Sequence, residues 1–234
     1  DLHLSIRRQR QMCIRDSTTL EGSSLSVASV DGQTKNLVLN FAQTTSLDGS
    51  FANITDLTSE GDVSLNGTIT TLGNQAFNAG VNLAGDTTLT GNSLSVANVD
   101  GQTKNLVLYF SQTTSIDGNF TNINDLIIEG DVSLNGNLTT LGDQTYQAAA
   151  SLAGYAILEG ESLLFSNGVD GASHSLGLDF SKSTALNGTF ENIDFLTSGG
   201  DVSLNGTICT IQSQTYNANV SLSGNTILEG AALS

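Results

Sequence analysis

Residues 61–67 read GDVSLNG, and the same seven residues recur unchanged at 130–136 and 200–206. A second stretch, VDGQTKNLVL at 30–39, returns at 99–108 and then, with changes, at 169–178 as VDGASHSLGL. Recurrence at a fixed spacing is the signature of a repeat architecture, in which each unit packs against its neighbours. The chain is therefore interpreted as an array before any single element is assigned.

The period of this array is 69 or 70 residues, and Gly168 is the one insertion. A fourth copy begins near the end of the sequence, so we expect the chain to be a fragment of a longer array. Residues 18–234 are predicted to form one continuous solenoid. Its units are repeat 1 at 18–86, repeat 2 at 87–155, repeat 3 at 156–225, and the start of repeat 4 at 226–234.

Within each copy, apolar and polar residues alternate in short runs, for example SLSVASV at 24–30 and GVNLAG at 80–85. Alternation predicts strands with one buried face, and the Gly, Asn and Asp residues between the runs suit tight turns. Residues 146–165 have a helical composition, but their counterpart in repeat 1 is rich in Gly and Thr. Because repeats share a fold, we predict strands there too.

Three all-β architectures compete for a unit of this length. Sandwich domains need nearer 100 residues and propeller blades about 40 to 50. L-x-G turn signals at Leu20, Leu47, Leu65 and Leu89 are separated by 27, 18 and 24 residues, an average of 23. This spacing favours a parallel β-helix with about three coils per repeat. Roughly nine coils would make a rod about 45 Å long.

In a β-helix, large apolar side chains fill the interior and Ser, Thr and Asn face solvent. We expect recurring phenylalanines in the core and recurring asparagines at turns, where their amides satisfy backbone groups. The core set is Phe41, Phe110, Phe180, Phe51, Phe120 and Phe190, and the turn set is Asn66, Asn135 and Asn205.

Residues 1–17 differ from the rest, because they hold all four arginines, the one methionine and Cys13. The segment RQMCIRDS resembles a translated transposase-end adapter of short-read DNA sequencing, and we interpret residues 1–17 as a non-native, unstructured segment. A genuine basic arm that binds nucleic acid or an anionic membrane is the alternative.

Without that segment, residues 18–234 contain 3 basic and 21 acidic residues, a net charge of −18. Such a chain repels phosphate backbones and anionic lipid, so we expect no nucleic-acid binding. Its apolar runs are too short to cross a bilayer as helices, so we expect no membrane insertion. Cys209 is the one cysteine of residues 18–234, which excludes a disulfide framework and a cysteine metal site there. It stands where the other copies have Thr70 and Thr139, so we interpret it as a neutral substitution in a strand.

The segment GDVSLNGTITTLGNQAFNAGVNLAGDTTLTG at 61–91 resembles the repeats of filamentous-haemagglutinin-like exoproteins and autotransporter-type adhesins of Gram-negative bacteria. The resemblance includes the Q-x-aromatic stretches around Phe77, Tyr146 and Tyr216, and it covers nearly all of residues 18–234. It implies a right-handed parallel β-helix that an outer-membrane transporter exports, by two-partner secretion or as an autotransporter. The implied location is the cell surface and the implied role is adhesion or aggregation through surface glycans or proteins.

A β-helix can also house a polysaccharide lyase or glycosidase, which needs acids at one special site. Here most acids recur beside Gly in turn-like contexts, so we interpret them as turn residues: Asp31, Asp100, Asp170, Asp62, Asp131 and Asp201. Glu191, Asp194 and Asp179 do not recur, yet they match no catalytic pattern. His174 occupies the position of Lys35 and Lys104, which suggests an exposed site. We predict no enzyme activity, no catalytic or cofactor-binding residues and no cofactor.

Other functional classes find weaker support. EF-hand and nonapeptide calcium motifs are absent from the sequence, so we predict no metal site. A T-x-T ice-binding ladder fits Thr68-Ile69-Thr70 but breaks at 137–139 and 207–209. A phage tail-fibre segment stays open as an alternative. Glycosylation at N-x-S/T triplets such as Asn53, Asn119 and Asn187 is not supported beyond chance.

Overall fold

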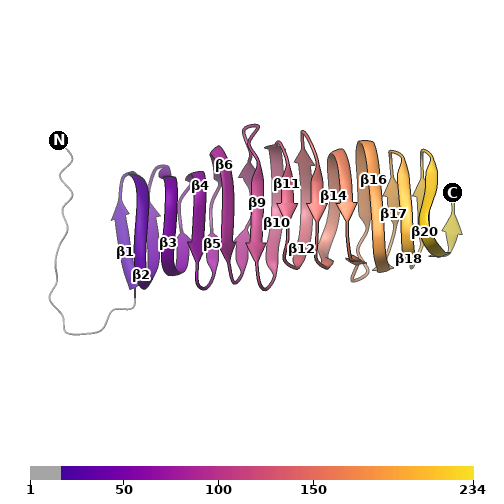
Figure 1. Cartoon of the computed structure of the whole chain (residues 1–234), viewed down its shortest axis with the longest axis horizontal. Coiled ribbons are helices and arrows are strands. Elements are labelled where there is room, and N and C mark those ends of the chain that lie inside the picture. The colour runs from indigo at the N-terminus through magenta and orange to yellow at the C-terminus, as the bar shows by residue number, and fades with distance from the viewer. Residues whose placement is uncertain (1–16) are drawn as a thin grey trace.

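The computed structural model describes residues 17–234, which form an elongated all-β rod (Figure 1). The strands follow one another along the rod in chain order, with β1 and β21 at opposite ends. Their bounds are β1 (Ser17–Gly22), β2 (Leu25–Phe41), β3 (Thr45–Ser59), β4 (Val63–Thr71), β5 (Gln75–Phe77), β6 (Val81–Gly91), β7 (Leu94–Val96), β8 (Val99–Asp100), β9 (Leu106–Phe110), β10 (Thr114–Ile123), β11 (Leu126–Ile128), β12 (Val132–Thr140), β13 (Gln144–Tyr146), β14 (Ala150–Phe165), β15 (Gly168–Asp170), β16 (Leu176–Ile193), β17 (Leu196–Ser198), β18 (Val202–Thr210), β19 (Ser213–Tyr216), β20 (Val220–Glu229) and β21 (Ala232–Leu233).

Strands pair in parallel with the next coil of the chain. Leu47, Leu65 and Leu83, for example, stack on one another in β3, β4 and β6. Longer strands such as β14 and β16 bend around a corner and contribute to more than one face of the rod. The prediction of a parallel β-helix is confirmed.

The coil is shorter than the L-x-G spacing suggested. Paired residues are 17 to 21 positions apart, as in Ile54–Thr71, Leu47–Leu65 and Val99–Phe120, rather than 23. The described chain therefore makes about 11 turns instead of nine. The L-x-G motif overestimates the coil length because it does not occur in every coil. Other residues form the turns at several corners.

The coil has three faces, and each repeat is rotated by one face relative to the repeat before it. Leu65 belongs to a column with Leu47 and Leu83. Its counterpart Leu134 stacks instead with Ile116 and Leu152, on the face that also carries Phe77. The third counterpart, Leu204, stacks with Leu186 and Leu222 on the remaining face. One repeat thus spans eleven faces, or three and two-thirds turns, and three repeats complete eleven turns.

The interior is a continuous stack of aliphatic and aromatic side chains. All six phenylalanines that we assigned to the core are buried, with Phe51, Phe120 and Phe190 at 1% exposure or less. Tyr146 stacks on Phe165 with ring centroids 4.6 Å apart, and Phe165 meets Phe190 edge-on at 5.7 Å. Aromatic residues from different coils therefore fill the middle of the rod and hold successive coils together.

Two finer predictions have different outcomes. Residues 146–165, which have a helical composition, lie in β13 and β14, so the prediction of strands is confirmed. The prediction for the asparagines is wrong about their hydrogen-bond partners. Asn66 and Asn135 donate their amide protons to Asp48 and Asp117 of the previous coil, each at 2.6 Å, and not to turn backbone groups.

Ser17 is the first described residue, and it pairs with Asn36 as part of β1. The interpretation of residues 1–17 as an adapter-derived segment otherwise concerns residues outside the described part of the chain.

Candidate functional site

The repeated aspartates Asp31, Asp100 and Asp170 form one kind of turn. Asp170 Oδ1 accepts hydrogen bonds from the backbone N–H of Ala172 at 3.1 Å and from the side-chain amide of Asn192 at 3.0 Å. The bond from Ala172 is the main cause, ahead of that from Asn192, of a lowered pKa of the Asp170 carboxyl group. The same two bonds recur at the other aspartates, so these carboxylates support the turn.

The turn that these aspartates support has an unusual backbone. Ala172 and Ser173 both have positive φ angles, of 45° and 68°, as do their counterparts in the other repeats. Non-glycine residues rarely adopt this conformation, and here the aspartate and the asparagine of the next coil hold it in place. His174 ends this turn and is half-buried. Its backbone N–H donates to Gly171 and its carbonyl accepts from the N–H of Asp194, so the backbone of His174 links two coils.

A second set of repeated aspartates caps the following coil. Asp62 accepts a bond from the N–H of Gly80 at 3.0 Å, Asp131 from Ala149 at 3.2 Å, and Asp201 from Asn219 at 3.1 Å. Each bond joins one coil to the next. The interpretation of both repeated sets as turn residues agrees with these contacts.

Two of the three non-repeating acids have an acidic neighbour on the preceding coil. Glu191 is aligned with Asp170, and Asp179 is aligned with Glu159, whereas Asp194 belongs to neither pair. Among residues 17–234, no three His, Cys, Asp or Glu side chains are placed to hold a metal ion together.

The remaining sequence candidates are scattered over the rod. Cys209 is a half-buried free thiol. Thr68 and Thr70 stack on Thr88 and Thr90, but the next coil places Val107 and Tyr109 at these positions, so the T-x-T ladder has two rungs. Because repeats rotate by one face, the counterparts of this motif lie on other faces and cannot extend it.

A buried polar cluster was not anticipated as such from the sequence. Gln144 Nε2 donates to the carbonyls of Leu138 at 3.0 Å and Glu159 at 2.9 Å, and Gln75 and Gln214 make the equivalent bonds. Tyr146 donates its hydroxyl to Gln144 Oε1 at 2.9 Å. Burial raises the pKa of the Tyr146 hydroxyl and raises that of Tyr216 to about 12. The Q-x-aromatic motif was the available signal, and the structure gives it a role in the core.

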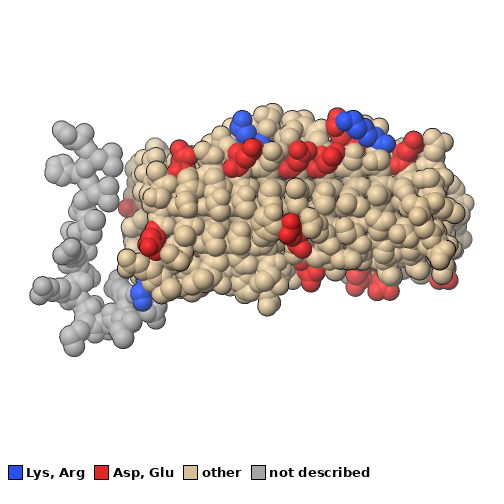
Figure 2. Space-filling model, viewed as in Figure 1, with Lys and Arg blue, Asp and Glu red and all other residues tan. Residues whose placement is uncertain are grey.

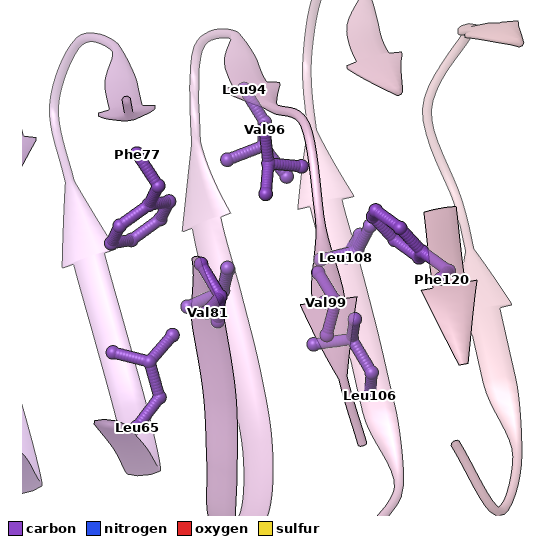
Figure 3. Close-up of a pocket in the computed structure, with 10 residues that line it drawn as sticks. Leu65, Phe77, Val81, Leu94, Val96, Val99, Leu106, Leu108 and Phe120 are labelled. Atoms are coloured by element: carbon purple, nitrogen blue, oxygen red, sulfur yellow. The ribbon is translucent and has the colours of Figure 1, made fainter. Parts of the chain in front are cut away.

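Two hollows in the described part of the chain differ in kind. The first is an apolar void of about 10 Å³ inside the coil, near Phe77, Val81 and Leu108 (Figure 3). Because it has room for about one water molecule and no polar lining, it cannot hold a ligand. The second is a shallow surface hollow of about 230 Å³ beside the two-residue strand β8, with Asn82, Asn98, Asp100, Asn119 and Thr121 at its edge.

Charge is distributed along the rod without a single focus. Acidic side chains are spread over the visible face in Figure 2, and wide uncharged areas separate them. Lys182 pairs with Glu161 of the preceding coil. No helix of residues 17–234 is long and apolar enough to cross a membrane.

Comparison with known proteins adds no assignment. No protein-family model, curated protein or solved structure matches this chain.

Proposed function

We propose that this chain is a structural rod segment of a large exported bacterial surface adhesin of the filamentous-haemagglutinin type. In this role the segment mediates adhesion and aggregation at the cell surface and performs no catalysis itself. The observation that carries the proposal is the uninterrupted stack of about 11 coils in which repeated acids serve as inter-coil bonds. Such a stack is stiff along its axis because each coil is hydrogen-bonded to both neighbours.

Export and surface location are part of the same proposal. The motifs that resemble exoprotein repeats support it, and so do the strongly acidic composition and the single cysteine in residues 18–234. A chain with one cysteine forms no internal disulfide, and it can be threaded through an outer-membrane transporter before it folds.

Surface display tests this function directly. Residues 18–234 are fused between an anchor and an epitope tag on a non-adherent laboratory bacterium, and cell settling and attachment to a host-cell monolayer are measured. We expect faster settling or stronger attachment than with a spacer of equal length and net charge. Equal behaviour of the two strains would contradict the proposal.

The two alternative functions are tested with the purified chain. Release of reducing ends from plant or bacterial polysaccharides by the purified chain would favour a polysaccharide-degrading enzyme. A stable trimer in light scattering would favour a phage tail-fibre segment, because such fibres are built as trimers.

A further inference from the structure

Two exposed aromatic rings lie on one face of the rod, where repeat 2 meets repeat 3. Tyr155 and Phe195 are 55% and 46% exposed, and each lies just before a strand segment of the same face. Those segments begin at Ala156, Leu176 and Leu196, which stack on three successive coils. The two rings are therefore two coils apart, or about 10 Å. We name Tyr155, Ile157, Ser175, Gly177, Phe195 and Thr197 the aromatic face.

One repeat earlier, the equivalent positions form a polar ladder. Asp86 accepts a bond from the N–H of Asn105 at 2.9 Å, Asn105 accepts from the N–H of Asp125 at 3.2 Å, and Asp125 accepts from the N–H of Asp143 at 2.9 Å. One repeat later, Tyr155, Ser175 and Phe195 replace the three ladder residues Asp86, Asn105 and Asp125. The aspartates that stabilise the turn elsewhere have been exchanged for exposed rings, which gives up inter-coil hydrogen bonds without adding to the core.

Gly177 lies on the coil between Tyr155 and Phe195. It stands where the other repeats have Val38 and Val107. A Cβ atom at position 177 would lie 3.5 Å from the hydroxyl of Tyr155, so the tyrosine side chain extends over this glycine toward the next coil. The absence of a side chain at Gly177 leaves room for the Tyr155 side chain.

Hydrogen-bonding groups lie on and beside the aromatic face. Glu159 and Asp179 are aligned on neighbouring coils of the same face, and Asp179 is exposed. Ser175 and Thr197 add hydroxyl groups. Lys182 is paired with Glu161, so it does not offset these carboxylates. The face thus combines two apolar ring surfaces with acceptors for hydroxyl protons, in an acidic setting that repels anions.

We propose that the aromatic face binds an uncharged glycan chain lying along the rod axis. Sugar rings present apolar C–H surfaces that stack on Tyr155 and Phe195, while their hydroxyl groups donate to Glu159 and Asp179. Two exposed rings about 10 Å apart offer a short line of contact, whereas a folded protein needs about 800 Å² on each partner. Sulfated or uronic-acid glycans are excluded by the neighbouring carboxylates.

This proposal rests on the adhesin function for its biological meaning, since it names a class of ligand for the rod itself. Its failure is distinguishable from failure of the rod function. If the purified chain binds no glycan but the displayed chain still promotes adhesion, the glycan proposal fails and the adhesin function stands. If the displayed chain promotes no adhesion, the adhesin function fails, whatever the purified chain binds.

The test uses the full chain with chitotetraose and cellotetraose as probes, in calorimetric titrations and in NMR spectra of the aromatic rings. We expect binding of at least one tetrasaccharide with shifts of the Tyr155 and Phe195 ring signals. Y155D and F195D introduce the residues found one repeat earlier at Asp86 and Asp125, so both variants should fold. Each should weaken binding about tenfold, the effect of one lost ring contact.

Two further variants sharpen the result. G177V restores the valine of the other repeats, and it should weaken binding because the added side chain displaces that of Tyr155. Y109D is the control, because Tyr109 is an exposed tyrosine outside this face at the position of Asp179. It should leave binding unchanged. Absence of binding to both sugars, or binding by Y155D and F195D as tight as that of the unsubstituted chain, would overturn the proposal. So would binding of tetralysine in place of the sugars, which would identify a cation-binding face.

Discussion

At the scale of single residues, the three repeats differ in how completely they satisfy the same buried glutamine. Tyr146 and Tyr216 donate their hydroxyl groups to Gln144 and Gln214 at 2.9 and 3.0 Å. In repeat 1 the aromatic residue is Phe77, and Gln75 Oε1 is buried without a hydrogen-bond partner. An unsatisfied buried acceptor costs free energy because it has lost its bond to water.

The substitution Phe77→Tyr should correct this defect. The new hydroxyl would donate to Gln75 Oε1, as the hydroxyl of Tyr146 donates to Gln144 Oε1 in the next repeat. We expect the free energy of unfolding to rise by about 1 kcal/mol, the net value of one hydrogen bond. Urea denaturation followed by circular dichroism measures the change.

The reverse substitution, Tyr146→Phe, serves as the matched control. It should lower the free energy of unfolding by about 1 to 3 kcal/mol, because it leaves Gln144 Oε1 unsatisfied. If both substitutions shifted stability in the same direction, the hydroxyl would not be the group responsible.

The buried tyrosines also predict how stability depends on alkaline pH. Burial raises the pKa of Tyr216 from 10.0 to about 12 in the folded chain. Because the folded-state pKa is the higher one, the contribution to stability is complete below pH 10 and is lost as the pH rises from 10 to 12. Burial also raises the pKa of Tyr146. Tyrosinate absorbance should therefore lag behind that of exposed tyrosines until the chain unfolds.

Tyr216→Phe tests this pH dependence. It removes one titrating group, so stability should fall less steeply above pH 10 than in the unsubstituted chain. A tyrosinate titration in which all tyrosines ionise together near pH 10, with unchanged circular dichroism, would contradict the expectation.

At the scale of the element, each corner of the coil depends on side chains that cap the backbone of the next coil. Asp62, Asp131 and Asp201 perform this function at equivalent corners of the three repeats. Gly67 and its counterparts fit close to the backbone of the preceding coil, where a Cβ would lie 2.4 Å from the carbonyl oxygen of Gly49. Corners therefore restrict residue type more strongly than the outward positions of the strands do.

Asp131→Ala removes one such cap. The N–H of Ala149 loses its acceptor, and we expect the free energy of unfolding to fall by about 1 kcal/mol. Thermal melts of the purified chain measure the effect. Asp131→Asn keeps an acceptor oxygen and should be nearly neutral, so equal losses for the two variants would indicate that charge and not the hydrogen bond matters.

At the scale of the whole molecule, the rotation of each repeat by one face determines what the rod can display. Any outward feature of the repeat appears on a different face each time and returns to the same face after three repeats. Continuous ladders of identical side chains along one face are therefore not formed, as the two-rung threonine ladder illustrates. Instead, a feature that occurs once in the array, such as the aromatic face, is presented on one side only.

Deletion of residues 87–155 tests this geometry. It removes one whole repeat and joins Asp86 to Ala156, which reproduces the ordinary junction between repeats. We expect the shortened chain to fold, because every segment of the repeat already occurs on more than one face. Circular dichroism should show the same β signal per residue.

Deletion of residues 87–120 is the contrasting variant. It joins Asp86 to Thr121, which places an outward residue where an inward one is required. This chain should misfold or aggregate, because a shift by one residue turns side chains to the opposite face. Cooperative folding of both shortened chains would argue against the strict three-face register.

The last coil carries a liability of its own. Val220, Leu222, Ile227 and Leu233 are 44 to 67% exposed in β20 and β21, where no further coil follows in this chain. An uncapped strand edge with apolar residues promotes association. Leu222→Lys should therefore reduce self-association in analytical ultracentrifugation. The same substitution at Leu164, a partly exposed residue within the stack, should have little effect, and a monomeric unsubstituted chain would refute the prediction.

Much of this architecture was determined by the sequence alone. The period of the repeats and the alternation within GDVSLNG and its neighbours predicted parallel strands, the phenylalanine core and strands over 146–165. These features are local or are repeated three times, so they can be predicted without knowing which coils are in contact. The adhesin role and the interpretation of residues 1–17 rest on resemblance and stay predictions.

Only the tertiary structure decided the coil length, the rotation of the repeats and the membership of each surface. Hydrogen bonds between coils set the register, and the corners accommodate spacings that range from 17 to 21 residues between paired positions. A spacing averaged over one motif cannot reveal that difference. For the same reason Tyr155 and Phe195, 40 residues apart in the sequence, could be placed on one face only after the coils were stacked.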